Sequence, residues 1–398
     1  MTAPLEGIVV ADFSRVLAGP YATMLLADLG ATVIKVERPG VGDDTRAWGP
    51  PWAAESSSYF ESVNRSKLSV VLDLTDPADL EVARSLAAKA DVVIENFRAG
   101  TMGRYGLDHE CVAAGNPGVV YCSITGFGSG AGAALPGYDF VVQALGGLMS
   151  ITGEPDRDPM KVGVALVDVL TGKDATIAIL AALRSRDVHG LGQRVEVNLL
   201  SSLLGSLANQ ASSYLATGRP PERMGNQHPS IAPYETLDCA DGVIALACGN
   251  DAQFVRLVDV LGKPELATDP RFGSNAERVA NRVELVRALE ERLVTSTAEK
   301  WEQALLEAGI AAARVGDLGS AFTRATELGL DPTFAVGPGR TAQVSHPITY
   351  SDHAPRRDLP PPGLGEHGRL VRDWCATPAG NPLVFPVRTH GSARQPAS

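Results

Sequence analysis

The stretch GIVVADFSRVLAGPYATMLLADLGATVIKVERPG (7–40) decides the fold, because two strand patterns flank a helical one. Residues 7–13 and 32–40 are short apolar runs rich in β-branched residues, and Pro-Gly ends the second run. The segment 20–31 between them has the length and composition of a helix. A strand, a helix and a second strand in this order predict two parallel strands joined by a crossover helix.

The same alternation continues along the first part of the chain. Further strands are predicted at 68–74, 91–97 and 118–127, and a helix with proline in its first turn at 77–90. This pattern predicts an α/β fold with a parallel sheet and helices on both faces. Ligands of such sheets bind beyond the carboxyl ends of the strands. The loops expected there are SRVLAGP (14–20), ERPGVGDD (37–44) and ENFRAG (95–100).

The composition of the chain changes after about half its length. Helical patterns cover 138–153 and 163–183, and a strand followed by a helix is expected from 193 onward. Residues 218–231 are rich in Pro, Gly and polar residues and are predicted to be a linker. A hairpin turning at Ala-Asp-Gly is then expected within 232–250, followed by several helices. The second part is therefore predicted to be a small α+β domain.

Composition and charge narrow the classes of function. The chain has 398 residues, 44% of them hydrophobic and 20% charged, which suits two or more globular domains. Its formal charge of −11 argues against general nucleic-acid binding, so an anionic ligand would need a local basic pocket. Five widely spaced cysteines indicate a reducing compartment. No signal peptide or membrane span is predicted, so we expect a soluble, cytoplasmic protein.

Several familiar site patterns are absent from the sequence. No G-x-G-x-x-G follows the first strand, which argues against ordinary NAD binding. The seven histidines are scattered without ligand spacing, so no metal site is predicted. The sequence contains neither the G-x-S-x-G elbow of serine hydrolases nor a Walker loop.

Three arginines follow strand ends in the first domain. Arg38 comes after the second predicted strand, Arg98 after the fourth, and Arg104 six residues later. Arginine binds phosphate through two parallel hydrogen bonds, so these residues suit a polyphosphate such as a nucleotide or coenzyme A. The alternative is that they are solvated surface residues. The sequence also offers three aromatic residues, Phe97, Tyr105 and Tyr138. Their rings either flank an adenine or belong to the core.

Motifs along nearly the whole chain resemble one family in the same order. The sequence is similar to family III CoA-transferases, the group that includes formyl-CoA transferase, carnitine CoA-transferase and α-methylacyl-CoA racemase. The matching segments are 12–46, NRSKLSVVLDL (64–74), ADVVIENFRAGTMGRYGL (90–107), SITGFG (123–128), 137–155, VGVALVDVLTG (162–172), RVEVNLLSSLL (194–204), the GN-x-H-P segment (225–229) and PGLGEH (362–367).

Asp168 in ALVDVLTG is the candidate catalytic residue. From the residues alone, an Asp before an apolar helix is a candidate N-cap. The resemblance implies instead that Asp168 is the nucleophile, which attacks an acyl-CoA thioester and then carries CoA as an aspartyl thioester. Covalent catalysis of this kind divides one difficult exchange into easier steps. A helix N-terminus also supplies amide donors, so both roles can belong to one residue.

The resemblance also implies a CoA site. The residues that match the family's CoA-binding positions are Val16, Leu17, Ala18, Arg38, Leu72, Asn96, Phe97, Arg98, Arg104, Gly137 and Tyr138. Leu17 departs from formyl-CoA transferase, which has a glutamine there, so a larger or less polar acyl group than formate or oxalate is expected. The stretch ACGNDAQF (247–254) has one glycine where that enzyme has a glycine-rich lid, so the lid is expected to differ.

Two alternatives remain beside a CoA-transferase. A racemase of this family pairs the helix Asp with a histidine, and this chain has Tyr138 at that place. A tyrosine of ordinary pKa near 10 is a poor base at neutral pH, so transfer is favoured. A non-catalytic acyl-CoA-binding protein would need no carboxylate at the position of Asp168.

The family implies an architecture as well. Its members are homodimers of interlocked rings, each protomer having a Rossmann-like large domain built from both termini and a small domain between them. Expected boundaries are 1–217 for the N-terminal part of the large CoA-binding domain, 218–231 for a linker, 232–325 for the small domain and 326–398 for the return linker and C-terminal part. The expected substrates are acyl-CoA and a small carboxylic acid, without metal or NAD.

Overall fold

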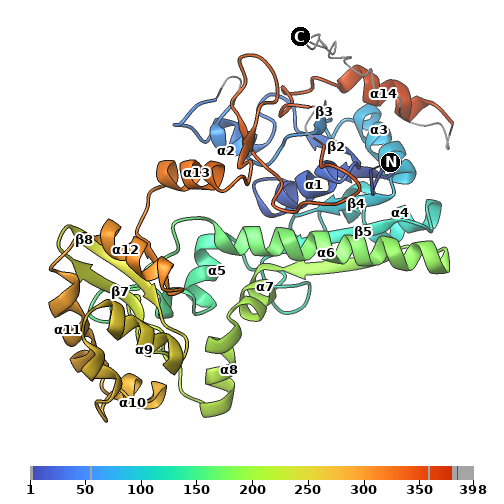
Figure 1. Ribbon diagram of the computed structural model, residues 1–398. Coiled ribbons are helices and arrows are strands. Elements are labelled where there is room, and N and C mark those ends of the chain that lie inside the picture. Colours follow the sequence, from blue (N-terminus) through green and yellow to red (C-terminus); the bar gives the residue numbers. More distant parts are fainter. Residues whose placement is uncertain (1–2, 54–55, 357–358, 379–382, 384–398) are drawn as a thin grey trace, which may run out of the picture. The chain divides into compact units, whose positions relative to one another are not determined.

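A computed structural model describes residues 3–53, 56–356, 359–378 and 383. The chain forms two compact units (Figure 1). Unit 1 comprises Met1–Val142, Ala165–Ser206 and Thr333–Ser398, and unit 2 comprises Gln143–Val164 and Leu207–Pro332. Both ends of the chain thus belong to unit 1.

Unit 1 is built on a six-stranded sheet in the order β3-β2-β1-β4-β5-β6. Every neighbouring pair is parallel, which confirms the predicted α/β class. The order is that of doubly wound Rossmann-type sheets, with the reversal between β1 and β4. The strands are β1 (Val9–Asp12), β2 (Thr32–Glu37), β3 (Lys67–Val71), β4 (Val92–Glu95), β5 (Val120–Thr125) and β6 (Gln193–Asn198).

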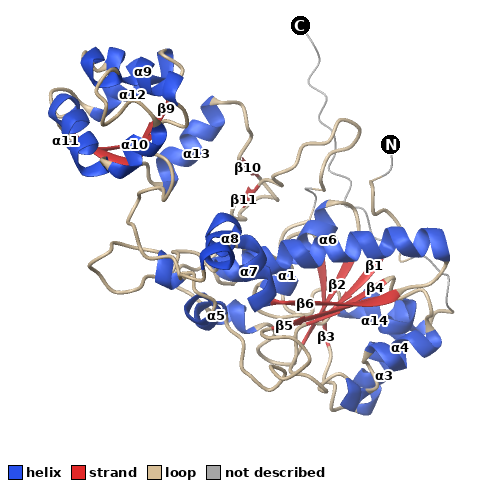
Figure 2. Ribbon diagram, turned by 90° about the horizontal axis from the view of Figure 1, so that it is seen from below, coloured by secondary structure: helices blue, strands red, loops and turns tan. Residues whose placement is uncertain are grey.

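Helices cover both faces of this sheet (Figure 2). One face carries α1 (Ala18–Asp28) and the long α6 (Leu166–His189), which pack on each other. The other carries α3 (Pro77–Lys89), α4 (His109–Gly115) and α14 (Gly368–Ala376). The helix α3 begins as the sequence predicts, since Pro77 stands at its first position and Asp76 accepts the N–H groups of Ala78 and Asp79.

The C-terminal helix α14 completes the core of unit 1. Val371 and Trp374 are buried in the cluster that also holds strand and α3 residues. The ammonium group of Lys89, at the end of α3, donates hydrogen bonds to the carbonyls of Trp374 and Cys375 at 2.7 and 2.9 Å. These bonds hold the last turn of α14 against α3. Shorter elements of unit 1 are α2 (Ser58–Glu61), α7 (Leu199–Ser206), β10 (Thr333–Phe334) and β11 (Gln343–Val344).

Unit 2 holds an antiparallel sheet in the order β7-β8-β9 with helices packed on it. The predicted hairpin is confirmed, since β7 and β8 pair from Tyr234↔Ala247 to Cys239↔Gly242. Arg278 is fully buried and donates to the carbonyls of Ala232 and Phe272. The elements are α8 (Ala208–Thr217), β7 (Tyr234–Cys239), β8 (Gly242–Ala247), α9 (Asp251–Val260), α10 (Asn275–Ala280), α11 (Arg282–Leu293), α12 (Ala298–Glu307), β9 (Ala311–Arg314) and α13 (Leu318–Glu327).

One expected helix differs from the structure in detail. The helix predicted at 138–153 is the shorter α5 (Asp139–Leu145) followed by a single 3-10 turn, because Gly147 adopts φ +87°, which a helix cannot accommodate. Residues 143–164 and 207–217, expected in the large domain, group with unit 2. The expected domain boundaries stay a prediction.

Within the described ranges, no helix is both long and apolar enough to span a bilayer. All five cysteines are free, and Cys111 is exposed.

Candidate active site

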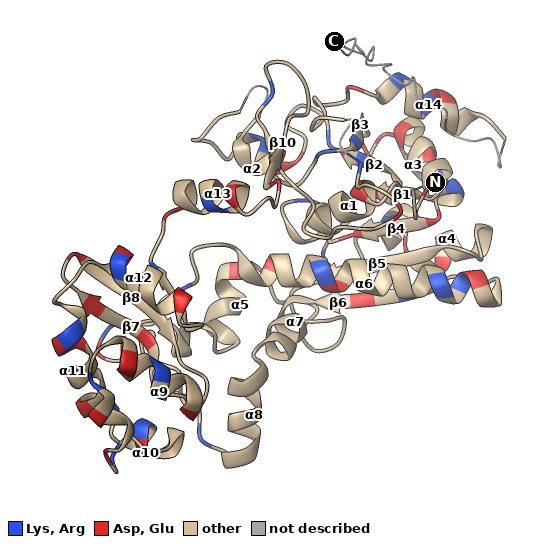
Figure 3. Ribbon diagram, in the orientation of Figure 1, with Lys and Arg blue, Asp and Glu red and all other residues tan. Residues whose placement is uncertain are grey.

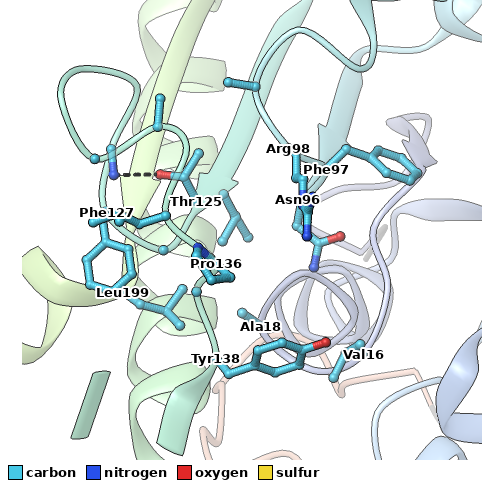
Figure 4. A pocket seen from close by; sticks show the side chains of 18 of the residues that line it. Val16, Ala18, Asn96, Phe97, Arg98, Thr125, Phe127, Pro136, Tyr138 and Leu199 are labelled. Carbon is cyan, nitrogen blue, oxygen red and sulfur yellow. Dashed lines mark hydrogen bonds between the residues drawn. The ribbon is translucent and has the colours of Figure 1, made fainter. Parts of the chain in front are cut away.

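A cavity of about 270 Å³ lies at the carboxyl ends of β1, β4 and β5. Its walls come from the segments that follow these strands, at residues 15–18, 96–99 and 124–128, together with 132–133 and 135–138, Asp168 and Leu199. The reversal of strand order lies between β1 and β4, where sheets of this type bind their ligands. Figure 4 shows Asn96, Phe97 and Arg98 on one wall and Thr125, Phe127 and Pro136 on the other.

A second cavity, of about 220 Å³, adjoins the first along the same sheet edge. It lies beyond β2 and β3 and includes Arg38, Leu72, Thr75 and Tyr105. Arg15 and Phe97 line both cavities, and the guanidinium carbon of Arg15 lies 5.1 Å from the centre of the Phe97 ring. The two cavities thus lie next to each other along the sheet edge, with Asp168 at the first and Arg38 at the second.

Asp168 is the third residue of α6 and lines the first cavity. The N-cap is Ala165, which has no side-chain acceptor. The carboxylate of Asp139 caps the helix instead, with Oδ1 accepting the N–H of Val167 at 2.7 Å and of Asp168 at 3.2 Å. The interpretation of Asp168 as the N-cap is therefore wrong, because its side chain takes no part in capping.

The electrostatic surroundings of Asp168 favour its neutral form. Burial, and secondly the charge of Asp139, raise the pKa of Asp168 to about 7. Tyr59 packs against the buried residues Leu17, Met24 and Val63, and burial together with the charges of Asp168 and Asp139 raises the pKa of its hydroxyl to about 12. At neutral pH the carboxyl group of Asp168 is thus present in both its protonated and its ionised form, while the hydroxyl of Tyr59 stays protonated.

Gly172 explains how α6 reaches the cavity. A Cβ at this position would lie 2.7 Å from the carbonyl oxygen of Ala18 and 3.1 Å from the ring of Tyr21. The absence of a side chain lets the first turns of α6 pack directly on the start of α1. Asp168, one turn earlier, is thereby brought to the same cavity as Val16, Leu17 and Ala18.

An apolar wall forms the part of the first cavity near Asp168. Leu17 is buried with Met24 and Val63, and Val16, Tyr21, Tyr59, Ala165 and Val169 pack against these three. Leu17 also lines the cavity, so the part of a ligand next to it meets hydrocarbon and not a hydrogen-bonding group.

Most of the residues expected to bind CoA lie at the two cavities. Those at the first are Val16, Leu17, Ala18, Asn96, Phe97, Arg98, Gly137 and Tyr138. Those at the second are Arg38, Leu72 and, again, Phe97. Tyr138 is 63% exposed, so it is no core residue. Arg104 is exposed on a turn after β4, lines neither cavity and lies 3.4 Å from Thr101 Oγ1.

Arg15 and Asp139 are site residues that sequence reasoning missed. Arg15 directly precedes Val16 in a loop already expected at the sheet edge, so its position was the available signal. Asp139 follows Tyr138, but its role as a cap depends on a helix whose capped N–H groups lie 28 and 29 residues later. In the described part of the chain, no group of three or more His, Cys, Asp or Glu side chains is arranged to hold a metal ion.

Comparison with known proteins gives one consistent family. The family model described as CoA-transferase family III matches residues 5–368. A succinate–glutarate CoA-transferase of Agrobacterium fabrum is 44% identical over 92% of this chain and 94% of its own length. An acetyl-CoA:oxalate CoA-transferase of Acetobacter aceti is 39% identical over 94% and 96%. The crystal structure of a CAIB/BAIF family protein from Brucella suis, 44% identical, superposes with a TM-score of 0.85 over 94% of this chain and 100% of that one.

Proposed function

Because this chain belongs to CoA-transferase family III, we propose that it moves CoA from an acyl-CoA donor to a dicarboxylic acid through covalent intermediates on Asp168. The observation that carries the proposal is a half-buried carboxyl group, with its pKa raised to about 7, in a cavity at the switch point of the sheet.

The reaction follows from the chemistry of a carboxylate and a thioester. Asp168 attacks the thioester carbonyl, and CoA thiolate leaves, which gives a mixed anhydride. The thiolate then attacks the aspartyl carbonyl, releasing the donor acid and leaving an aspartyl-CoA thioester. The acceptor carboxylate attacks that thioester, and the thiolate finally attacks the acceptor's acyl carbon, which frees Asp168 and the new acyl-CoA. Each step exchanges one acyl bond for another, so no external reactant is required.

The surroundings of Asp168 suit both halves of this cycle. A carboxylate with a raised pKa is a stronger nucleophile than an ordinary one and is still ionised in part at neutral pH. The cap made by Asp139 fixes the first turn of α6, so the reacting group is held by a helix and not by a loop.

The two cavities give CoA a place to bind. The adenine and phosphates would lie in the second cavity, near Arg38, Leu72 and Tyr105, and the thioester in the first. Arg38 already donates to Gly42 O at 3.2 Å and pairs with Asp44, so its side chain is held at the cavity. Phe97, which lines both cavities, would contact the middle of the ligand.

Charge and apolar surface together support a dicarboxylate as acceptor. Arg15 and Arg98 line the cavity of Asp168 and can balance the remote carboxylate of such an acid. The two relatives are named for succinate, glutarate and oxalate, all of which are dicarboxylates. Leu17 presents hydrocarbon beside Asp168, which suits the methylene chain of succinate or glutarate better than oxalate.

A homodimer of interlocked protomers in the cytoplasm is part of the proposal. The helices α7 and α8 carry no charged residue (Figure 3). Apolar side chains on α5, α6 and α8 are strongly exposed, with Phe140 at 60%, Ile177 at 64% and Leu215 at 81%. Exposed apolar surfaces of this kind usually mark protein interfaces. Five free cysteines suit a reducing compartment.

A transfer assay tests the proposed function. Succinyl-CoA would be mixed with glutarate, oxalate and the monocarboxylate butyrate, and new acyl-CoA separated by chromatography. We expect glutaryl-CoA to form fastest. Equal rates with glutarate and butyrate would contradict the dicarboxylate class, and α-proton exchange in deuterated water without transfer would indicate a racemase. Tight CoA binding without any turnover would indicate a binding protein.

A further inference from the structure

Residues 14–16, here called the 14–16 turn, connect β1 to α1 and form one side of the active-site cavity. Arg15 and Val16 line this cavity, and the following Leu17 and Ala18 line it as well. Val16 adopts φ +70°, which is unfavourable for a β-branched residue. Such a conformation persists only where the surrounding structure enforces it.

Side chains hold the backbone of the 14–16 turn at five successive polar groups. The N–H of Ser14 donates to Asp12 Oδ1 at 2.9 Å, and its carbonyl accepts from Lys35 Nζ at 3.0 Å. Both backbone groups of Arg15 bond to the amide of Asn96, at 2.9 and 2.7 Å. The N–H of Val16 lies 3.3 Å from each carboxylate oxygen of Asp43.

Lys35 and Asp43 also form a buried ion pair. Their side chains are 0% exposed, and Lys35 Nζ lies 2.8 Å from Asp43 Oδ2. Burial alone would lower the pKa of Lys35, but Asp43, Asp12 and Glu37 raise it. Burial alone would raise the pKa of Asp43, but Lys35 and the groups of Thr45 lower it. Both members of the pair are therefore charged at neutral pH.

A second buried lysine, Lys67, does not hold the 14–16 turn. Lys67 Nζ lies 3.4 Å from Asp12 Oδ2 and donates to Pro20 O and Asn64 Oδ1, both outside the turn. Burial lowers the pKa of Lys67 to about 7. Its charge is thus only partial at neutral pH, and its hydrogen bonds do not reach residues 14–16.

We propose that the Lys35–Asp43 pair is a positioning element of the active site, which holds the 14–16 turn in the conformation that forms the CoA cavity. A buried ion pair is seldom needed for stability, because apolar residues of similar volume often stabilise a protein equally well. Here each partner also bonds to one end of the turn, Lys35 at the carbonyl of Ser14 and Asp43 at the N–H of Val16. The positioning role of the pair rests on the proposed function in one respect, which is that the cavity binds CoA.

Paired variants separate positioning from stability. Lys35→Met and Asp43→Asn each remove one charge of the pair and leave the other buried, so both should lower the melting temperature. The double variant Lys35→Met/Asp43→Asn removes both charges and should regain most of the stability. The dissociation constant of CoA should nevertheless stay about tenfold higher than in the unchanged protein, since the turn has lost charge-assisted hydrogen bonds. Backbone amides of a peptide spanning residues 13–20 should exchange faster with deuterated water.

Arg65 and Asp28 give a matched control. They form another buried pair of unit 1, with side chains 4% and 1% exposed, and share two hydrogen bonds of 2.9 and 2.6 Å. The double variant Arg65→Met/Asp28→Asn should change stability without raising the dissociation constant of CoA or the exchange of the 13–20 peptide. If the Lys35/Asp43 double variant regains CoA affinity and slow exchange together with stability, the pair is merely structural and the proposal is wrong.

Glycine at position 16 provides a rescue experiment. Glycine adopts positive φ without strain, so the turn of Val16→Gly needs less support. Asp43→Asn should therefore weaken CoA binding less in a Val16→Gly background than in the unchanged sequence. An equal loss of CoA affinity in both backgrounds would contradict the proposal that Asp43 acts on CoA binding through the 14–16 turn. Amide exchange is measured without substrate, so this readout remains decisive even if transfer to glutarate fails.

Discussion

The carboxylate of Asp139 caps the helix whose third residue is Asp168, accepting the N–H groups of Val167 and Asp168 at 2.7 and 3.2 Å. The side chain of Asp139 thus has two effects on Asp168. It fixes the first turn of α6, and its negative charge adds to the effect of burial in raising the pKa of Asp168 to about 7.

Asp139→Asn separates these two effects. Asparagine keeps an acceptor for the helix N–H groups but carries no charge, so the pKa of Asp168 should fall while the cap remains. Burial is the larger cause of the shift, so the new value should lie between 3.8 and about 7. The pH midpoint of enzyme acylation by succinyl-CoA, measured in single turnover, should therefore move to lower pH. Asp139→Ala, which also loses the cap, is the control. An unmoved midpoint in Asp139→Asn would show that the charge of Asp139 does not influence Asp168.

Asp168→Asn should increase stability at pH 8. A carboxyl group with a pKa near 7 in the folded state and 3.8 unfolded binds more protons when folded, so wild-type stability falls as pH rises from 4 to 7. Asparagine does not titrate, so the variant avoids this loss. The gain in the free energy of unfolding is at most about 4 kcal/mol above pH 7, and it vanishes near pH 4. Denaturant unfolding at both pH values measures it.

The control for this comparison lies on the same helix. Asp174 is exposed on α6, so Asp174→Asn should show no such difference between pH 4 and pH 8. If the stability difference of Asp168→Asn does not depend on pH, the carboxyl group has an ordinary pKa.

Gly172→Ala should disturb the active site. The added Cβ would lie 2.7 Å from the backbone oxygen of Ala18, so α6 must move away from α1. We expect a loss of about 1–3 kcal/mol in stability and a clear fall in acylation rate. Gly205 lies in α7, where an added Cβ would meet nothing within 4 Å, so Gly205→Ala should lower neither the stability nor the acylation rate. Unfolding and acylation of the two variants would be compared side by side.

The sequence predicted the sheet well because its signals are local. The strand β4 (Val92–Glu95), for example, coincides with a short apolar run, and all four of its residues are buried in the structure. The sequence predicts too long a helix at 138–153, since periodicity alone does not show that Gly147 adopts a positive φ. The candidate nucleophile Asp168 and most of the expected CoA-binding positions came from the family resemblance and not from spacing.

The remaining features depend on contacts between distant segments. Lys35 and Lys67 would be expected at the surface from residue type, yet both are buried because the carboxylates of Asp43 and Asp12 lie beside them. The capping of α6 by Asp139 also joins separate segments. Arg104 follows the family motif but lies outside both cavities, which residue matching could not reveal.

Intact-protein mass spectrometry after mixing with succinyl-CoA tests the covalent role of Asp168 most directly. The unchanged protein should gain the mass of a succinyl group or of CoA, and a protease digest should place it on the peptide that contains Asp168. Asp168→Ala should bind CoA with similar affinity and gain no mass. Labelling that persists in Asp168→Ala, or transfer to glutarate by that variant at an undiminished rate, would contradict the account.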